Sequence, residues 1–378
     1  MKTLMLISGG LGRPSAEETD RLAAADQFPR VRLFEQVLNT DLLPPEALGS
    51  APRLFRMVYR YLPEAAAQAL EAFRIRNRYD AILTWSERRA FAFALIKKIT
   101  RVKIPHIPLL YWMSKQKQAP LLRATGSAMD CIVTWSSVQR QYAIDHLGIS
   151  PSKILLVRHP IDQKFYRPME GPGDMICAVG SENRDYGTLI TALTGSDIHC
   201  HIASRDIRII QGNSARTISV NSLGALPPNM TLGYKSYAEL RELYRRSRFA
   251  VVPLYPSDTD NGITVILEAM AMGKPVICSR TKGQVDVIEE GKTGLFVEQG
   301  NPRMLREAIE HLWNSPAEVQ EMGRAARAFV ERYHSIDLFT ETVRSIVEDV
   351  IAGRQPHVPA ALTPVKEQIA SQTGAGSR

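Results

Sequence analysis

Short apolar runs alternate with amphipathic helical patterns along almost the whole chain. In the first half the strand-like runs are Leu4–Ser8, Ala81–Trp85, His106–Tyr111, Cys131–Trp135 and Ile154–Val157. Helical patterns such as Ala90–Ile99 and Val138–His146 lie between them. Alternation of this kind is typical of parallel βαβ units. We therefore expect an α/β fold built on doubly wound parallel sheets.

The second half repeats the scheme after a proline-containing linker, His159 to Pro168. Its strand-like runs are Met175–Val179, Ile198–Ala203, Thr217–Val220, Phe249–Pro253, Pro275–Cys278 and Gly294–Phe296. Its helical patterns include Tyr186–Leu193, Tyr237–Arg245, Thr264–Met272 and Pro302–Trp313. A chain of 378 residues suits two domains of ordinary size. We expect domains at 1–160 and 161–337, a helix at 338–352 packed back on the first domain, and a mobile tail at 353–378.

Charge and cysteine usage narrow the class of protein. The net charge of +8 favours anionic partners without identifying them. No helix-turn-helix, zinc or RNA-binding signature accompanies that charge, so we expect no nucleic-acid binding. The four cysteines lie in or beside strand-like runs, which indicates buried thiols in a reducing compartment. We expect a cytoplasmic protein, because the N-terminal apolar run is too short for a signal peptide and no run reaches the length of a membrane span.

The segment Arg53–Leu62 mixes basic and aromatic residues. One interpretation is an interfacial helix that rests on the inner face of a membrane. The other, which we favour slightly, is a helix packed on the sheet with its arginines outside.

The strongest local signal lies after the apolar run Val251–Pro253. A polar loop, 257–262, leads into a helix that begins near Ile263. Gly262 permits close approach of a ligand, and the backbone amides at this helix start suit a phosphate. Glu268 lies one turn after Thr264 on the same face, where its carboxylate suits two sugar hydroxyls. The alternative is an ordinary βα unit in which these side chains only cap and solvate the helix.

Several blocks resemble a known family. The segment Asp260–Glu268 and the following residues to Val276 resemble the acid-x7-Glu motif of retaining glycosyltransferases of family 4, which have the GT-B fold. Other blocks of that family resemble, in the same order along the chain, the stretches 157–168, 232–244 and 284–297. The resemblance implies two Rossmann-like domains facing across a cleft, with nucleotide-sugar binding in the second and acceptor binding in the first.

The resemblance also implies roles for individual residues. Asp260 matches the first acid, usually Glu, which contacts the transferred sugar, and Glu268 would hold the donor ribose. The remaining donor-binding residues would be Gly9, Gly10, Tyr234, Lys235, Asn261, Gly262, Ile263 and Thr264. We add Glu87 as a catalytic candidate, because it follows the run Ala81–Trp85.

One departure concerns the basic pair that clamps the diphosphate in this family. Ser181 and Tyr186 stand at those positions. Arg184 is the nearest cation and our best substitute, with Arg205 a weaker candidate, because a diphosphate leaving group needs positive charge. The sequence Asp258–Asp260 is also a DxD, but such a triplet arises easily by chance. We expect neither a metal nor another cofactor, with the nucleotide sugar as co-substrate.

The favoured hypothesis is transfer of a sugar, with retention of configuration, from a nucleotide-diphosphate sugar to a hydroxyl. The acceptor could be lipid-linked, a glycan or a small molecule, in synthesis of a glycolipid, polysaccharide or other glycoconjugate. Two alternatives stay open. One is a catalytically degenerate binding subunit of the same fold, which the departures at Asp260 and at the basic pair motivate. The other is a nucleotide-sugar epimerase of the same fold.

Overall fold

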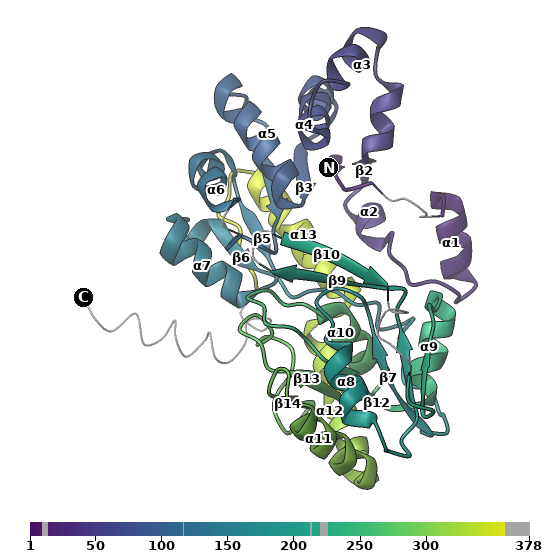
Figure 1. Ribbon diagram of the computed structural model, residues 1–378. Helices are drawn as coiled ribbons and strands as arrows, with labels where there is room; N and C mark the ends of the chain where they lie inside the picture. The colour runs from purple at the N-terminus through teal and green to yellow at the C-terminus, as the bar shows by residue number, and fades with distance from the viewer. Residues whose placement is uncertain (10–13, 116, 212–213, 220–225, 360–378) are drawn as a thin grey trace. The chain divides into compact units, whose positions relative to one another are not determined.

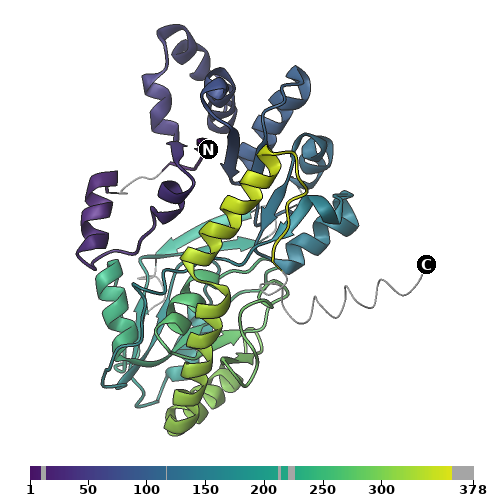
Figure 2. The same cartoon turned by 180° about the vertical axis from the view of Figure 1, so that it is seen from behind.

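The chain forms two compact units (Figures 1 and 2). A computed structural model describes residues 1–378 except 10–13, 116, 212–213, 220–225 and 360–378. Unit 1 comprises Met1–Ser15, Arg32–Arg158 and the chain from Asp337 onward, and unit 2 comprises Ala16–Val31 and His159–Ile336.

Unit 1 is built on a six-stranded parallel sheet with the order β2-β1-β3-β4-β5-β6. The strands are β1 (Thr3–Leu6), β2 (Thr40–Leu43), β3 (Ala81–Trp85), β4 (His106–Leu109), β5 (Ile132–Thr134) and β6 (Ile154–Leu156). The α-helices are α2 (Leu33–Val37), α3 (Arg53–Tyr59), α4 (Glu64–Ile75), α5 (Glu87–Thr100), α6 (Ala119–Thr125), α7 (Ser137–Leu147) and α13 (Ile336–Ile351). Short 3-10 helices lie at Pro45–Ser50, Arg76–Arg78, Gly126–Ala128 and Pro151–Lys153.

Unit 2 has a second six-stranded parallel sheet, with the order β11-β8-β7-β12-β13-β14. Its strands are β7 (Met175–Val179), β8 (Cys200–Ala203), β11 (Met230–Leu232), β12 (Ser247–Val252), β13 (Val276–Ser279) and β14 (Gly294–Val297). Its helices are α1 (Ala16–Ala24), α8 (Tyr186–Leu193), α9 (Tyr237–Arg246), α10 (Ile263–Ala271), α11 (Pro302–Asn314) and α12 (Pro316–Tyr333). Strands buried on both faces require near-continuous apolar runs, and β7 and β13 have them.

The predicted α/β fold with two doubly wound parallel sheets is confirmed. One predicted strand belongs to a different sheet from the one expected. The run Thr217–Val220 was expected in the main sheet, but β10 (Ser214–Ser219) pairs antiparallel with β9 (Asp206–Gln211) in a separate hairpin, and Val220 lies outside the described residues. Four of the six residues of β10 are polar, so it lacks the continuous apolar run of a strand buried in a parallel sheet.

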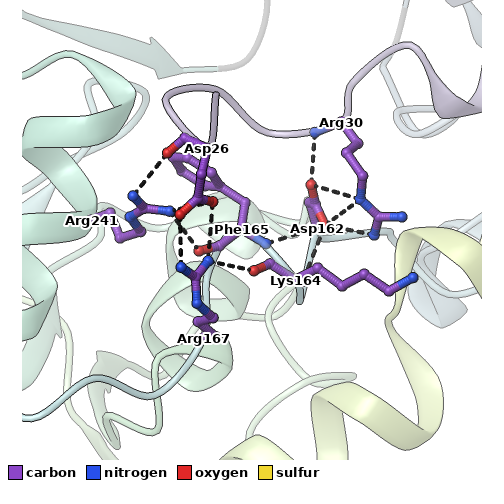
Figure 3. Close-up of polar contacts among 7 residues, drawn as sticks. All are labelled: Asp26, Arg30, Asp162, Lys164, Phe165, Arg167 and Arg241. Carbon is purple, nitrogen blue, oxygen red and sulfur yellow. Dashed lines mark hydrogen bonds and ion pairs between the residues drawn. The ribbon is translucent and has the colours of Figure 1, made fainter. Parts of the chain in front are cut away.

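Residues 16–31 were expected in the first domain but cluster with unit 2. The reason is charge pairing, shown in Figure 3. The Asp26 carboxylate accepts hydrogen bonds from Arg167, at 2.7 and 3.1 Å, and from Arg241 at 2.8 Å. These two arginines hold the pKa of Asp26 down at about 2.

A second anchor of the same segment is Arg30, which pairs with the buried Asp162 (Figure 3). Its guanidinium donates to Asp162 Oδ1 at 2.7 Å, and its backbone N–H donates to Oδ2 at the same distance. The Phe28 ring packs edge-on against Tyr237, with centroids 4.5 Å apart. Sequence periodicity carries no signal for such pairings between distant parts of the chain.

The structure also bears on the state of the cysteines and on membrane-spanning helices. All four cysteines are buried free thiols, as predicted. No helix in the described part of the chain has both the length and the apolar character needed to cross a bilayer.

Candidate functional site

The carboxyl edge of the unit 2 sheet carries the polar groups that the sequence singled out. Strands β7 and β12 are neighbours in this sheet. Gly180, whose φ is +97°, directly follows β7, and Gly262, whose φ is +87°, ends the loop after β12. Both glycines adopt the left-handed region that other residues rarely enter. Ligands of open parallel sheets bind at this edge, so the two glycines mark a candidate site.

Arg184 lies between these two glycines. A Cβ atom added at Gly180 would lie 2.5 Å from Arg184 Nη2, and one added at Gly262 would lie 3.5 Å from both terminal nitrogens. The Nε and Nη1 groups donate to the carbonyls of Val179, at 2.9 Å, and Glu182, at 2.6 Å. The glycines therefore leave the space that the guanidinium occupies.

Backbone pairing explains how a loop residue is held in this place. Arg184 forms an antiparallel bridge with Leu254, next to the end of β12. On either side, the Asp185 N–H donates to the Pro253 carbonyl and the Tyr255 N–H donates to the Asn183 carbonyl. Asp185 also caps α8 by accepting from the Thr188 N–H. Backbone hydrogen bonds thus join the loop after β7 to the loop after β12.

Arg184 forms no direct ion pair among the described residues, and the nearest carboxylate known to feel its charge is that of Glu268. The side chain is only 3% exposed, and both of its hydrogen bonds go to backbone carbonyls. A buried cation without an ion-pair partner is costly unless an anion compensates it. The sequence suggested Arg184 only as the nearest cation, and the structure places it where an anion would bind.

The N-terminus of α10 adds to the same positive region. Gly262 is its N-cap residue, and no side chain caps the helix there. The Ile263 N–H donates to the Asp260 carbonyl, whereas the helix dipole and the other amides of the first turn favour an anion at this end. Thr264 is exposed in the first turn, whereas Ile263 is buried. The guanidinium lies beside this helix start, and binding of a phosphate there stays a prediction.

His159 belongs to this site and was missed by sequence reasoning. Its Nε2 lies 3.3 Å from Thr264 Oγ1. Burial lowers the pKa of His159 to about 4, so the imidazole is neutral at physiological pH. In the sequence His159 appears only as part of a linker, and nothing in its local pattern distinguishes it.

The loop before α10 holds two of the predicted residues. Asp260 is buried, with 6% exposed. The Asn261 side chain donates to Ser257 Oγ at 2.7 Å and to Thr259 Oγ1 at 2.8 Å. Gln284 donates to the Asn261 carbonyl at 3.1 Å. The Asn261 side chain therefore stabilises the loop, and the assignment of Asn261 to donor binding stays a prediction.

Glu268 is buried in α10 and already accepts two hydroxyl groups. The hydroxyls of Tyr166 and Tyr244 donate to Oε1 and Oε2 at 2.9 and 2.8 Å. Burial raises the pKa of Glu268 to about 7, although both tyrosines and the charge of Arg184 lower it. A carboxylate has about four lone-pair sites, so each oxygen retains capacity for another donor. Its assignment to the donor ribose stays a prediction.

Tyr234, Lys235 and Arg205 lie further along the same edge. Tyr234 follows β11 and is 63% exposed, and the Arg205 guanidinium, after β8, stacks 4.6 Å from its ring centroid. Strand β8 lies between β11 and β7, and adjacent strands are about 4.8 Å apart. The stacked pair therefore lies roughly 10 Å along the edge from the end of β7.

The sequence also singled out three residues of the first domain, Gly9, Gly10 and Glu87. Gly9 is exposed after β1, and a Cβ there would lie 2.9 Å from Glu46 Oε1, while Gly10 lies outside the described residues. Glu87 is buried, and its Oε1 accepts from the backbone N–H groups of Tyr111, at 2.9 Å, and Trp112, at 2.7 Å. Burial raises the pKa of Glu87. This carboxylate holds the loop after β4 in place, and its catalytic role stays a prediction.

An aromatic cluster at the carboxyl edge of the unit 1 sheet was also missed. Three of the four tryptophans follow or end neighbouring strands: Trp85 on β3, Trp112 after β4 and Trp135 after β5. Tyr111 stacks on Trp135 at 5.8 Å, and Trp85 contacts Trp135 at the same centroid distance. Tryptophan spacing in the sequence would have revealed it once the strand order was known.

A second contribution to this cluster comes from distant parts of the chain. Phe34, from α2, packs edge-on against Trp85 at 5.9 Å. Phe339, from α13, lies 6.5 Å from the same indole. Lys115 Nζ lies 4.5 Å from the Trp112 ring. Trp85, Tyr111 and Trp112 stay partly exposed.

Comparisons with known proteins agree with this geometry. Residues 209–329 match the family described as glycosyl transferases group 1. The chain is similar to an uncharacterized glycosyltransferase of Methanocaldococcus jannaschii, with 32% identity over 32% of this chain and 33% of that protein. It is also similar to the D-inositol 3-phosphate glycosyltransferase of Acidothermus cellulolyticus, with 24% identity over 97% of this chain and 90% of that one.

Solved structures share the fold. Sucrose-phosphate synthase from Thermosynechococcus elongatus has a TM-score of 0.67 at 16% identity, over 93% of this chain and all of that one. HepE of Anabaena in complex with UDP-glucose has a TM-score of 0.64 at 15% identity, with the same coverage.

Proposed function

We propose that this chain, a glycosyltransferase with a group 1 domain at residues 209–329, moves a sugar from a nucleoside diphosphate sugar to an acceptor hydroxyl. The observation that carries the proposal is the buried guanidinium of Arg184. It lies between two left-handed glycines, beside an uncapped helix N-terminus, and forms no direct ion pair with a carboxylate among the described residues. A diphosphate supplies the anion that this arrangement lacks.

Groups along this edge of the sheet suit the separate parts of such a donor. The stacked pair of Arg205 and Tyr234 offers a flat, exposed surface for the base. Arg184 and the first turn of α10 take the diphosphate, and Glu268 takes the ribose hydroxyls. The roughly 10 Å between the two ends of this row suits the length of a nucleoside diphosphate.

In the proposed reaction the bond between the anomeric carbon and the diphosphate oxygen breaks, and the nucleoside diphosphate leaves with the electron pair. The acceptor oxygen bonds to the anomeric carbon and loses its proton to a phosphate oxygen of the leaving group. Arg184 and the α10 amides stabilise the charge that develops on the diphosphate, so we propose that no metal is required. Retention of configuration rests on the resemblance of Asp260–Glu268 to retaining enzymes.

We assign the acceptor to unit 1, where aromatic side chains offer flat faces at the carboxyl edge of the sheet. Partly exposed Trp85, Tyr111 and Trp112 suit the apolar face of a sugar ring, whether free or part of a glycan or glycolipid. Glu87 and Gln139 hold the loop that carries two of these residues, since Gln139 Oε1 accepts from the Met113 N–H at 2.7 Å. A fixed loop keeps these rings in one orientation.

The test is turnover with a panel of UDP-, GDP-, ADP- and dTDP-sugars, starting with UDP-glucose because HepE was solved with it. We expect release of one nucleoside diphosphate and, by proton NMR, a product with the donor's anomeric configuration. Absence of both binding and turnover would refute the proposal. Binding without turnover would favour a degenerate binding subunit, and an epimerised nucleotide sugar would favour an epimerase.

A further inference from the structure

Helix α3 of unit 1 presents an apolar stripe to solvent. Leu54, Met57, Val58 and Tyr61 are 70, 58, 44 and 88% exposed. Their spacing of i, i+3, i+4 and i+7 places them on one face of the helix and the turn that continues it. Scattered exposed apolar side chains are common, but a contiguous stripe of four indicates a surface that is covered in use.

The opposite face of α3 accounts for its attachment to the protein. Tyr59 is buried and donates to Glu71 Oε2 of α4 at 2.7 Å. The Arg74 guanidinium carbon lies 5.3 Å from the centroid of the Phe55 ring, and Arg74 forms an ion pair with Glu71. The inner face thus docks on α4, so the outer stripe is not needed to hold α3. The arginines of α3 are exposed, as in the interpretation of a packed helix, but the outer face also carries the apolar stripe and the inner face contacts α4.

The charges around this stripe are all positive. Arg53, Arg56 and Arg60 are exposed on α3 and its end, and the sequence has no Asp or Glu between Glu46 and Glu64. No ion pair with a carboxylate involves these three arginines among the described residues. An apolar stripe flanked by uncompensated arginines is a typical membrane-interface pattern.

The neighbouring helices repeat the pattern. The chain has no Asp or Glu from Arg88 to Met129, although nine cations occur there: Arg88, Arg89, Lys97, Lys98, Arg101, Lys103, Lys115, Lys117 and Arg123. Two of these, Arg89 and Lys97, are buried and pair with Glu64 and Asp130, so the other seven supply the positive charge of this region. Leu95 and Ile99, on α5, are half or more exposed, at i and i+4. Helices α3 and α5 project at the same end of unit 1 in both views (Figures 1 and 2).

We propose that the exposed face of α3, flanked by α5, docks on an anionic lipid bilayer. The cations attract the lipid headgroups, and the aliphatic and aromatic side chains insert at the boundary with the acyl chains. Nucleic acid would account for the cations, but it offers no apolar phase for Leu54, Met57 and Val58. The proposal does not depend on the sugar-transfer reaction.

The experiment is flotation of the full chain with vesicles of phosphatidylcholine alone or mixed with phosphatidylglycerol, at low and high NaCl. We expect binding to the anionic vesicles that weakens as salt rises. The triple variant Leu54→Ser, Met57→Ser, Tyr61→Ser should bind at least about tenfold more weakly, because the apolar contacts are lost. The variant Arg53→Gln, Arg56→Gln, Arg60→Gln should lose about fivefold per charge.

The matched control is Val285→Ser with Met304→Ser, two exposed apolar residues of unit 2 that should leave flotation unchanged. Circular dichroism and thermal melting verify that every variant folds like the parent chain. The proposal is overturned by each of three results. These are no flotation of the parent chain with anionic vesicles, equal flotation of the apolar variant, and a dimer in sedimentation that the apolar variant dissociates. Tighter binding to a DNA duplex than to vesicles, unaffected by the serine substitutions, would also overturn it.

Discussion

The carboxyl edges of the two sheets differ in chemistry although both sheets have six parallel strands. The unit 2 edge has a buried cation, two left-handed glycines and an uncapped helix start around Arg184. The unit 1 edge has an aromatic cluster and a buried glutamate, Glu87, that binds backbone amides. One edge is built to receive an anion, and the other offers flat apolar faces. The same fold therefore presents different chemistry at the edge of each sheet.

The two buried glutamates show what decides this difference. Burial raises the pKa of both Glu87 and Glu268. Glu87 accepts from the main-chain N–H groups of Tyr111 and Trp112, which hold the loop after β4 in position, so this carboxylate has a structural role. Glu268 accepts from the side-chain hydroxyls of Tyr166 and Tyr244, which is the chemistry that a sugar diol also offers. The partners, more than the burial, separate a structural carboxylate from a candidate binding one.

The largest predicted effect is at Arg184. Arg184→Met should reduce kcat/KM for the nucleotide sugar by about 10²- to 10³-fold, because the leaving diphosphate loses its charge partner. Calorimetry should show weaker binding of UDP with unchanged binding of uridine. The matched control is Arg205→Met, an exposed cation on the same edge, for which we expect about tenfold or less. Equal losses for UDP and uridine would show that Arg184 supports only the fold.

A second prediction concerns the pH dependence of stability through Glu268. Its folded pKa of about 7 lies above the ordinary value of 4.5, so the folded state binds more protons between these values. Stability contributed by this group is present below pH 4.5 and is lost as pH rises through about 7. Urea unfolding at pH 5 and pH 8 should show a decrease of about 2–3 kcal/mol, which Glu268→Gln reduces. An unchanged pH dependence in that variant would show that other groups cause it.

The third prediction separates crowding at Gly180 from backbone strain. Gly180→Ala should lower the free energy of unfolding by about 1–2 kcal/mol for its left-handed φ. It should also weaken donor binding roughly tenfold, since its Cβ displaces Arg184 Nη2. Gly195→Ala has a similar φ of +72° with no atom within 4 Å, so it should show the strain alone. Equal donor binding by both variants would remove the link between Gly180 and Arg184.

The smallest effect is expected in unit 1. Trp112→Ala should raise KM for a saccharide acceptor about three- to tenfold, because one aromatic face is lost. KM for the donor should not change. The control Trp313→Ala removes an indole that lies under Arg248 in unit 2, and it should leave the acceptor KM as it was. A change in donor KM with Trp112→Ala would argue against separate roles for the two edges.

Sequence patterns revealed most of the parallel strands, because buried strands are short continuous apolar runs. They missed β2 (TDLL) and β11 (MTL), which are edge strands with few apolar residues. They also misplaced Thr217–Val220, and they gave no sign that residues 16–31 pair with unit 2. Such pairings join positions more than a hundred residues apart, as Arg30 and Asp162 do.

In the candidate site, too, local patterns revealed the residues of one segment but not the contacts between distant segments. Gly262, Thr264 and Glu268 lie on one contiguous strand–loop–helix unit, so local pattern and resemblance were enough to select them. Arg184 was only the nearest cation, because its position depends on pairing with Leu254. The contact between His159 and Thr264 and the aromatic cluster were invisible, since each depends on tertiary structure.

The central claim is that Arg184 holds the diphosphate of a nucleotide sugar at the carboxyl edge of the unit 2 sheet. A crystal structure of the chain with UDP-glucose tests it most directly. The prediction is a phosphate oxygen at hydrogen-bond distance, roughly 3 Å, from the Arg184 guanidinium and from an amide of the first turn of α10. A diphosphate bound elsewhere, with Arg184 still joined only to the Val179 and Glu182 carbonyls, would contradict the claim.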